Sequence, residues 1–282
     1  MIKIIQDSSL RHNKIQTSPI HKWDNNDFRQ VDDCVAIESP LEIRIGHQSD
    51  TLHTLAVTMC SPTDIIDLVT GYLLTENITK DINHLHNIEV FDNEMGLIAE
   101  VFLSEDIDIQ PYLNKRQGPV HASCGICGKT DFDDVLVFNY ADLKPSSLNI
   151  SSELLCSLPK KLNQTQHAYQ KTGGLHACAL FDFTGELLLM REDVGRHNAL
   201  DKLIGAASKQ GLLPLNDLII LLSGRISFEL VHKSLMAGAM TLCAIGAPSS
   251  LSIETAQSNG MNLIGFIQAS GYNHYTLTTH KP

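Results

Sequence analysis

The sequence has no long apolar run, and this absence argues against a helical membrane protein. The run at residues 218–222 is as long as any, and its five residues suit a buried strand. A membrane-spanning helix needs roughly 20 apolar residues. The N-terminus also lacks the apolar core and small-residue cleavage site of a secretory signal. We therefore expect a cytoplasmic protein that does not contact a membrane.

Positive charge is scarce as well. The chain has 282 residues, and 21 Lys and Arg stand against 32 Asp and Glu, so the net charge is −11. This balance excludes the broad basic face typical of nucleic-acid-binding proteins, although a local basic pocket for one phosphorylated ligand stays compatible with it. The 43% hydrophobic content and the length indicate a globular chain with one large domain or two smaller ones.

Closely spaced cysteines are limited to one pair. Of seven cysteines, only Cys124 and Cys127 lie near each other. An odd number of cysteines without a signal peptide does not indicate a disulfide framework. The other five are most simply small apolar core residues: Cys34, Cys60, Cys156, Cys178 and Cys243.

The first half of the chain predicts a polar arm and a small α+β domain. Residues 1–34 are polar and aperiodic and are expected to form an arm or a loosely attached strand. Alternating apolar and polar residues predict two hairpins, one from strands 41–45 and 54–58 and one from strands 88–91 and 97–103. Ser61, Pro62 and Asp64 predict a helix start, with Ser61 as the cap and Pro62 in the first turn. This domain spans residues 35–131.

The second half, residues 132–282, predicts an α/β domain. Its sheet is mixed because a hairpin opens the domain, and helices cover both faces. The expected strands are 175–181, 186–191, 218–222, 241–245 and 263–267, and the expected helices are 196–209, 227–239 and 252–258.

Residues 111–131 show no period and contain the motif Cys-Gly-Ile-Cys-Gly at 124–128. A thiol needs positive neighbours and solvent access to react as a thiolate, and Lys115, Arg116, His121 and Lys129 lie in this loop. A zinc half-site, a redox pair and an idle loop are the alternatives. A second ligand pair at zinc-site spacing is missing, so no metal site is predicted.

Two turns from strand to helix favour an anion site. Arg196 and His197 follow the first Gly turn. Arg225 lies in the second Gly turn, and Ser227 at its end is the expected cap of the next helix. Helix N-termini at strand carboxyl ends bind anions. The simpler alternative is that Asp193 caps its helix and Arg196 pairs with a local acid. Lys233 is expected to be solvated.

The segment His176-Ala-Cys178 is similar to the His-Ala-Glu of zinc nucleoside deaminases. The glutamate that acts as acid and base there is replaced by Cys178, and the paired cysteines precede the histidine instead of following it. A zinc deaminase is therefore disfavoured, and both residues are expected to face the core from a strand.

Taken together, five blocks resemble the FdhD/NarQ family of formate dehydrogenase accessory sulfurtransferases. The blocks are CGICG, TGGLHACA, EDVGRHNALDK, SGRISFELVHKS and GFIQASGYNHYT, in this order. The resemblance implies a homodimer with a cytidine-deaminase-like three-layer α/β/α domain and a smaller N-terminal α+β domain. It also implies a sulfurtransferase that takes persulfide sulfur from a cysteine desulfurase. The sulfur then goes to the molybdenum of bis-molybdopterin guanine dinucleotide, bound as cargo before its insertion into formate dehydrogenase.

The resemblance assigns roles to individual positions. Cys124 corresponds to the persulfide carrier, and Cys127 to a second cysteine whose role is less settled. The cofactor-binding hexapeptide corresponds to Phe266, Ile267, Gln268, Ala269, Ser270 and Gly271. It contains no Lys or Arg, so charge for the cofactor's phosphates would come from Arg196, His197 or Arg225. The alternative function is a chaperone that holds the molybdenum cofactor without sulfur chemistry.

Overall fold

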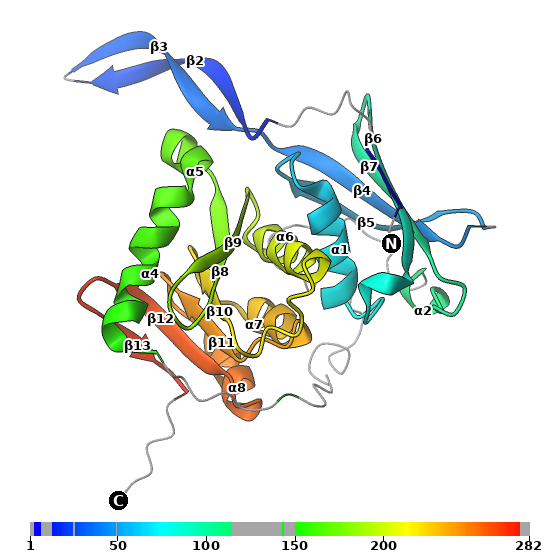
Figure 1. The fold of residues 1–282 in the computed structure, drawn as a ribbon. Coiled ribbons are helices and arrows are strands. Elements are labelled where there is room, and N and C mark those ends of the chain that lie inside the picture. Colours follow the sequence, from blue (N-terminus) through cyan, green and yellow to red (C-terminus); the bar gives the residue numbers. More distant parts are fainter. Residues whose placement is uncertain are drawn as a thin grey trace, which may run out of the picture.

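The structure is a computed structural model, and it describes residues 3–6, 13–24, 26–48, 50–113, 143 and 150–276. Figure 1 shows two larger sheets with helices between and around them and a two-stranded hairpin that projects from the rest. None of the helices in these described ranges is long and apolar enough to cross a membrane.

The first sheet has the strand order β1-β6-β7-β4-β5. Both predicted hairpins are confirmed, since β4 pairs antiparallel with β5 and β6 with β7. The alternating apolar side chains of β4, β5, β6 and β7 face helix α1 (Ile65–Thr75) and form one core with it. The strands are β1 (Lys3–Gln6), β4 (Ser39–Gly46), β5 (His53–Cys60), β6 (Leu85–Asn93) and β7 (Gly96–Leu103). Two short helices, η1 (Ile82–His84) and α2 (Gln110–Leu113), complete this part.

Helix α1 starts later than the sequence predicts. Its N-cap is Asp64, with φ 54°, and its first helical residue is Ile65. Ser61 is buried and does not cap the helix, because its Oγ accepts a hydrogen bond from the backbone N–H of Val194, 3.1 Å away. The prediction that Ser61 and Pro62 open the helix was therefore wrong, and a contact with a distant part of the chain explains why.

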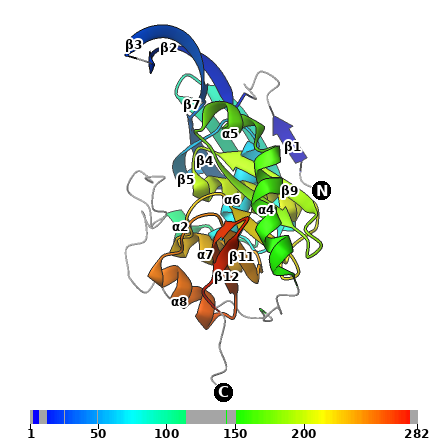
Figure 2. The same cartoon turned by 90° about the vertical axis from the view of Figure 1, so that its left-hand side faces the viewer.

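Strands β2 (Ile15–Asp24) and β3 (Asp27–Ala36) form the projecting hairpin, and they pair only with each other among the described strands. The hairpin extends away from the other elements in both views (Figures 1 and 2). Near its turn, the rings of Trp23 and Phe28 lie 4.7 Å apart and are 57% and 64% exposed. The sequence predicted an arm or a loosely attached strand for these residues and not a paired hairpin.

The second sheet has the order β13-β12-β11-β10-β8-β9, and it is mixed as predicted. Strands β10, β11 and β12 run parallel, whereas β8 runs antiparallel to both β9 and β10. Strands β9 and β10 are therefore parallel. The strands are β8 (His176–Phe181), β9 (Leu187–Asp193), β10 (Ile219–Leu222), β11 (Thr241–Ala244), β12 (Asn262–Gln268) and β13 (Gly271–His274).

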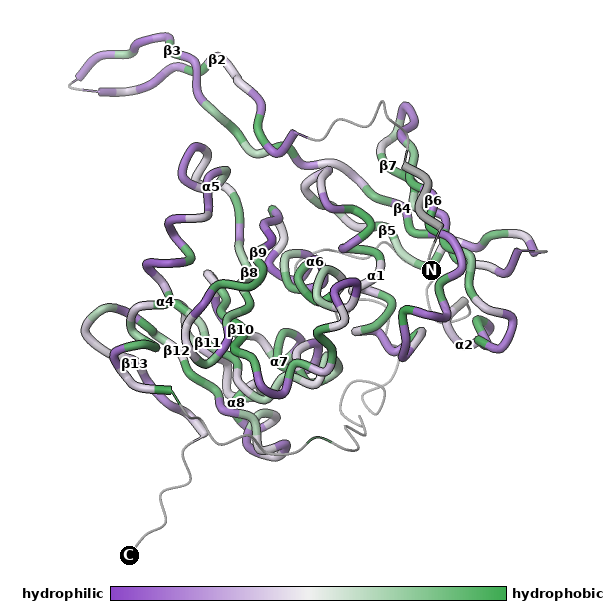
Figure 3. Tube along the Cα trace, viewed as in Figure 1, coloured by the Kyte–Doolittle hydropathy of each residue, from purple (hydrophilic) through white to green (hydrophobic). Residues whose placement is uncertain are grey.

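Helices cover both faces of this sheet, which confirms that part of the prediction. Leu155, Leu158 and Leu162 of α4 pack on one face, and the apolar sides of α6 and α7 pack on the other. The buried strands are accordingly hydrophobic in Figure 3, whereas most of the hairpin is hydrophilic. The likeness to cytidine deaminases stays a prediction. The helices are α4 (Ser152–Thr165), α5 (His167–Thr172), α6 (Arg196–Lys209), α7 (Phe228–Met236) and α8 (Ser250–Ser258).

Helices α1 and α6 cross at two glycines, and this crossing joins the two halves of the described chain. A Cβ atom at Gly71 would lie 1.8 Å from the carbonyl oxygen of Asp201, and one at Gly205 would lie 2.0 Å from that of Asp67. No side chain fits at either position, so the two backbones contact each other directly. The division at residue 131 stays a prediction, because that residue lies outside the described ranges.

Candidate functional site

The carboxyl ends of four strands lie at one edge of the second sheet. Strands β9, β10, β11 and β12 run in the same direction, and β8 begins at this edge with His176. Each of β9, β10 and β11 is followed by the start of a helix, α6, α7 or α8. In open α/β sheets, ligands bind in the crevice beyond the carboxyl ends of strands. This edge is therefore the candidate site.

The segments that follow β10 and β11 and the end of β12 are hydrogen-bonded to one another at this edge. The backbone N–H of Gly246 donates to the carbonyl of Gly224 at 3.1 Å, and that of Phe266 donates to Gly246 at 3.1 Å. A Cβ atom at Gly246 would lie 2.6 Å from the Gly224 oxygen, so the close contact requires glycine there. The segment after β10 thus lies beside the segment that the family resemblance assigns to the cofactor.

That hexapeptide forms the end of β12, a turn and the start of β13. Ile267 is buried in the sheet core, whereas Gln268, Ala269 and Ser270 are exposed. Phe266 interrupts the pairing of β12 with β13, has φ 53°, and is 48% exposed. A left-handed backbone is costly for a phenylalanine. It exposes an aromatic ring at the edge that a regular strand would not present there.

The three candidates for phosphate binding occupy different environments. Arg225 is exposed in the β10–α7 loop, and Arg196 is partly buried at the first position of α6. His197 is buried, and its Nε2 lies 3.0 Å from the Glu229 carboxylate and 3.2 Å from the Ser227 hydroxyl. Ser227 is the N-cap residue of α7, as predicted, but its side chain contacts His197 and makes no capping hydrogen bond. His197 therefore links the starts of α6 and α7.

His176 lies on the α6 and α7 side of the sheet, at the edge where β8 begins. Along β8, Cys178 and Leu180 pack in the core on that side, and alternation places His176 with them. A Cβ atom at Gly224 would lie 3.3 Å from its Nδ1. Burial and the positive charge of Arg196 lower the pKa of His176, with Asp193 opposing. The imidazole is therefore mainly neutral at neutral pH.

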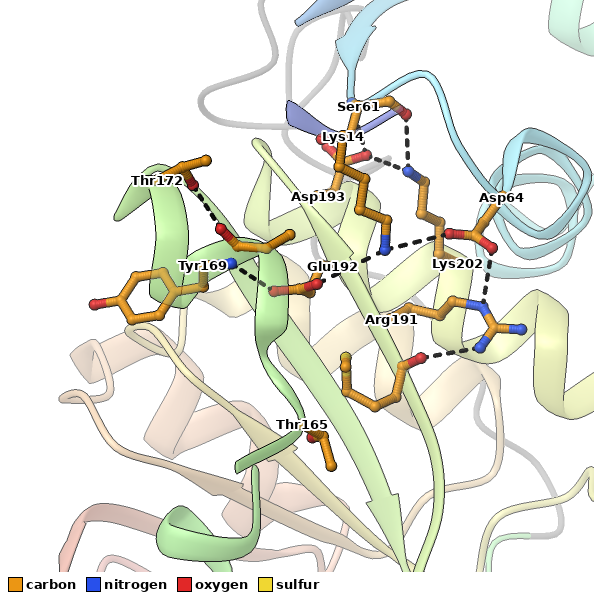
Figure 4. A network of polar contacts seen from close by, with 12 residues as sticks. Lys14, Ser61, Asp64, Thr165, Tyr169, Thr172, Arg191, Glu192, Asp193 and Lys202 are labelled. Carbon is orange, nitrogen blue, oxygen red and sulfur yellow. Dashed lines mark hydrogen bonds and ion pairs between the residues drawn. The ribbon is translucent and has the colours of Figure 1, made fainter. Parts of the chain in front are cut away.

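The motif of residues 192–202 joins the two halves of the described chain. Lys202 and Asp193 form a fully buried ion pair, with Nζ 2.6 Å from Oδ2. Lys202 also donates to the carbonyl of Ser61 at 3.0 Å, and the Ser61 N–H donates to Asp193 at 3.0 Å. The other Asp193 oxygen accepts from the Gly195 N–H at 2.8 Å. Figure 4 shows Asp193, Lys202 and Ser61 together at this junction.

Lys233 is buried, so the prediction that it is solvated was wrong. It is 2% exposed, and its Nζ lies 3.0 Å from each carboxylate oxygen of Asp201, 2.9 Å from the Thr75 hydroxyl and 3.3 Å from Glu76. Burial alone would lower the pKa of Lys233, but the charges of Asp201 and Glu76 outweigh it and raise the pKa. The lysine is therefore charged, and it ties α7 to α1 and α6.

A second set of ion pairs surrounds this junction, and Figure 4 shows those of Lys14 with Glu192 and Asp64. Lys14, at the base of the hairpin, lies 3.7 Å from Glu192 and 3.6 Å from Asp64. Arg191 donates from Nε to Asp67 at 2.8 Å. The sequence did not predict these roles, because the partners are distant along the chain.

The paired cysteines, Cys124 and Cys127, lie outside the described residues, as do Lys115, Arg116, His121 and Lys129; residues 111–113 of the predicted loop belong to α2. Of the other cysteines, Cys60, Cys178 and Cys243 are buried, as predicted, whereas Cys34 and Cys156 are only partly buried. Burial raises the pKa of the Cys178 thiol, so it stays protonated. Within the described ranges, no three His, Cys, Asp or Glu side chains gather so as to hold a metal ion.

Comparison with known proteins identifies the class of protein to which this fold and this edge belong. The model of the FdhD/NarQ family matches residues 36–280. The chain therefore belongs to the FdhD/NarQ family.

Several named relatives are similar to this chain over most of their length. A sulfur carrier protein FdhD from Nocardia farcinica is 40% identical over 247 residues, which cover 86% of each chain. One from Sulfurisphaera tokodaii is 36% identical over 264 residues, 93% of this chain and 97% of the relative. A solved structure from Desulfotalea psychrophila, assigned as a formate dehydrogenase accessory protein, has a TM-score of 0.69 and 20% identity and covers 94% of this chain and 98% of its own. The last likeness shows the fold.

Proposed function

We propose that this protein carries sulfur as a persulfide on Cys124 and delivers it to the molybdenum of bis-molybdopterin guanine dinucleotide. The sulfur comes from a cysteine desulfurase: the Cys124 thiolate attacks the outer sulfur of the desulfurase persulfide, and the desulfurase cysteine leaves as a thiolate. The cofactor is cargo, and its recipient is a formate dehydrogenase. The protein acts in the cytoplasm as a homodimer.

Membership of the family supports a sulfur-carrying role, since the relatives from Nocardia farcinica and Sulfurisphaera tokodaii are named sulfur carrier proteins. The motif Cys-Gly-Ile-Cys-Gly is present in this chain at residues 124–128. The names of these relatives and the presence of the motif both support the sulfur-carrying part of the proposal.

The observation that carries the nucleotide part is the hydrogen-bonded edge made by Gly224, Gly246 and Phe266. It places the exposed Phe266 ring and the exposed Arg225 on neighbouring segments. A guanine can stack on an aromatic ring, and a guanidinium can bind a diphosphate through charge-assisted hydrogen bonds. We therefore assign Phe266, Ile267, Gln268, Ala269, Ser270 and Gly271 to the guanine nucleotide, with Arg225 near its phosphates.

The decisive experiment loads the purified protein with a desulfurase and cysteine and measures its mass. We expect the wild type to gain one sulfur atom, and Cys124→Ser to gain none, because a hydroxyl cannot form a persulfide. Cys127→Ser is the matched control, and we expect it to retain loading. A serine variant at position 124 that still loads sulfur and still supports formate dehydrogenase would reject the proposal.

The same samples separate this function from that of a chaperone without sulfur chemistry. Cyanide releases thiocyanate from persulfide sulfur, so a sulfur carrier isolated after loading yields thiocyanate. A chaperone that only holds the cofactor yields none but still binds the guanine nucleotide.

A further inference from the structure

The edge of the second sheet, at the start of β8, contains a histidine without an assigned role. His176 is the first residue of β8, and its position in the sheet is fixed by pairing with Asp193 of β9. Its ring is half-buried, and within the described part of the chain neither ring nitrogen has a hydrogen-bond partner. A half-buried imidazole without a partner is free to bind a ligand that enters from solvent.

The surroundings of His176 make its protonation sensitive to an anion. Arg196 at the start of α6 is close enough for its charge to lower the pKa of His176. An anion seated against Arg196 and His176 would reverse this effect, because it adds negative charge beside both groups. Gly224 lies close on the Nδ1 side, where an added Cβ atom would come within 3.3 Å of the ring, so a larger residue would crowd the imidazole.

We propose that His176 is a ligand-binding residue of this edge, and that binding of a nucleotide diphosphate there is coupled to the uptake of one proton by its imidazole. The inference rests on the nucleotide site of the proposed function. It adds His176 to the residues of that site and adds the uptake of a proton to the binding step. The protonated ring donates a hydrogen bond to a phosphate oxygen, and the diphosphate is bound more tightly at lower pH.

Other charged groups lie near His176, and the test has to distinguish their titration from that of His176. On β9, Asp193 is already paired with Lys202. On α6, His197 contacts Glu229 of α7. Burial raises the pKa of Glu229 to about 7, so this carboxyl also titrates near neutrality. Arg225 is exposed in the β10–α7 loop.

The test uses GDP-mannose as the probe, because both of its phosphates are esterified and do not exchange protons near neutrality. Calorimetry on the full chain in buffers of different ionisation enthalpy measures the protons taken up on binding. We expect uptake approaching one proton near about pH 7, and a Kd that rises by up to about tenfold for each pH unit between the pKa values of the free and bound states.

Two variants assign the proton. His176→Asn and His176→Gln should bind without proton uptake and with a Kd that changes less than about threefold from about pH 6 to about pH 8, whereas Glu229→Gln should keep the wild-type pH dependence. Loss of uptake in Glu229→Gln but not in the His176 variants would overturn the inference, as would wild-type binding without proton uptake. Absence of GDP-mannose binding at every pH would instead reject the nucleotide site itself, and the inference with it.

Discussion

Single buried charges hold this chain together where its two halves meet. Lys202 and Asp193 are both fully buried, and each makes further hydrogen bonds to the chain around Ser61 or Gly195. Removing one member of such a pair leaves the other charge buried without compensation, at a cost of about 3–5 kcal/mol. A motif that the sequence suggests for anion binding therefore acts here, at Asp193 and Lys202, as a structural connection.

We expect Lys202→Met to lower the free energy of unfolding by about 3–5 kcal/mol, because Asp193 loses its counter-ion. Urea denaturation followed by circular dichroism measures the change. Lys209→Met is the control on the same helix: Lys209 pairs with Asp67 but is 33% exposed, and Asp67 keeps Arg191. Its loss should be below about 1 kcal/mol. Equal losses in both variants would contradict the importance of the buried pair.

Glu229 makes stability depend on pH. Burial raises its pKa from 4.5 to about 7, with Glu76 and Asp201 adding to the effect and Lys233 and Arg196 opposing it. The folded protein thus holds a proton that the unfolded chain has released. The stabilisation is present in full below about pH 4.5 and is lost as the pH rises to about 7.

Glu229→Gln removes this titration. The wild type loses stability relative to the variant as the pH rises. The difference between the free energies of unfolding, variant minus wild type, should therefore increase by about 2–3 kcal/mol from about pH 5 to about pH 8. Thermal denaturation at several pH values measures the difference. Glu254→Gln, at an exposed position on α8, should follow the wild type at every pH. A constant difference between the Glu229 variant and the wild type would show that the carboxyl is ionised throughout this range.

At the scale of elements, the crossing of α1 and α6 is the most tightly constrained contact. Gly71→Ala would place a methyl group 1.8 Å from the Asp201 carbonyl oxygen, so the helices would have to separate. We expect a loss of about 1–3 kcal/mol or more, since the obstacle is backbone. Gly174→Ala, whose Cβ would lie 3.3 Å from that of Ala36, is the control and should change stability by less than about 1 kcal/mol. Denaturation midpoints compare the two, and a Gly71 variant as stable as the control would show that the helices separate easily.

The sequence predicted the helices and strands that have a clear local pattern of apolar residues. Helix α6 occupies the predicted residues 196–209, and each predicted strand of the second sheet is found within two residues. Helix α4 was missed although Leu155, Leu158 and Leu162 mark its buried side, because Pro159 lies inside it and breaks the pattern. The hairpin was missed because most of its residues are exposed on both faces, so no apolar alternation marks its strands.

The candidate site was predictable only in part, for a physical reason. Strand order and direction place the loops after β10 and β12 at one edge, and this follows from the pattern of alternating strands and helices. The partners of buried charges do not follow from it. Lys233 pairs with Asp201, and Ser61 pairs with Asp193 at a separation of 132 residues. Such groups come together through the packing of α1, α6 and α7 against one another.

For the whole molecule, the β2–β3 hairpin and the body, meaning the two halves that contain the larger sheets, differ in the number of contacts that stabilise them. This difference can be measured. The two halves with sheets share buried ion pairs and a glycine crossing, whereas β2 and β3 pair only with each other within the described chain. A two-stranded hairpin is at best marginally stable in water. Lys14 fixes its base through Glu192 and Asp64, but no comparable contact of the described residues holds its turn.

The single tryptophan of the chain, Trp23, lies near this turn beside Phe28 and therefore reports on the hairpin alone. We expect the tryptophan fluorescence transition in urea to precede the far-ultraviolet circular dichroism transition, which follows the helices of the body. Trp23→Phe is the control: it should remove the fluorescence signal and leave the dichroism midpoint unchanged, because the ring is 57% exposed. Coincident transitions in the wild type would mean that the hairpin and the body unfold as one cooperative unit, with the contacts of Lys14 sufficient to couple them.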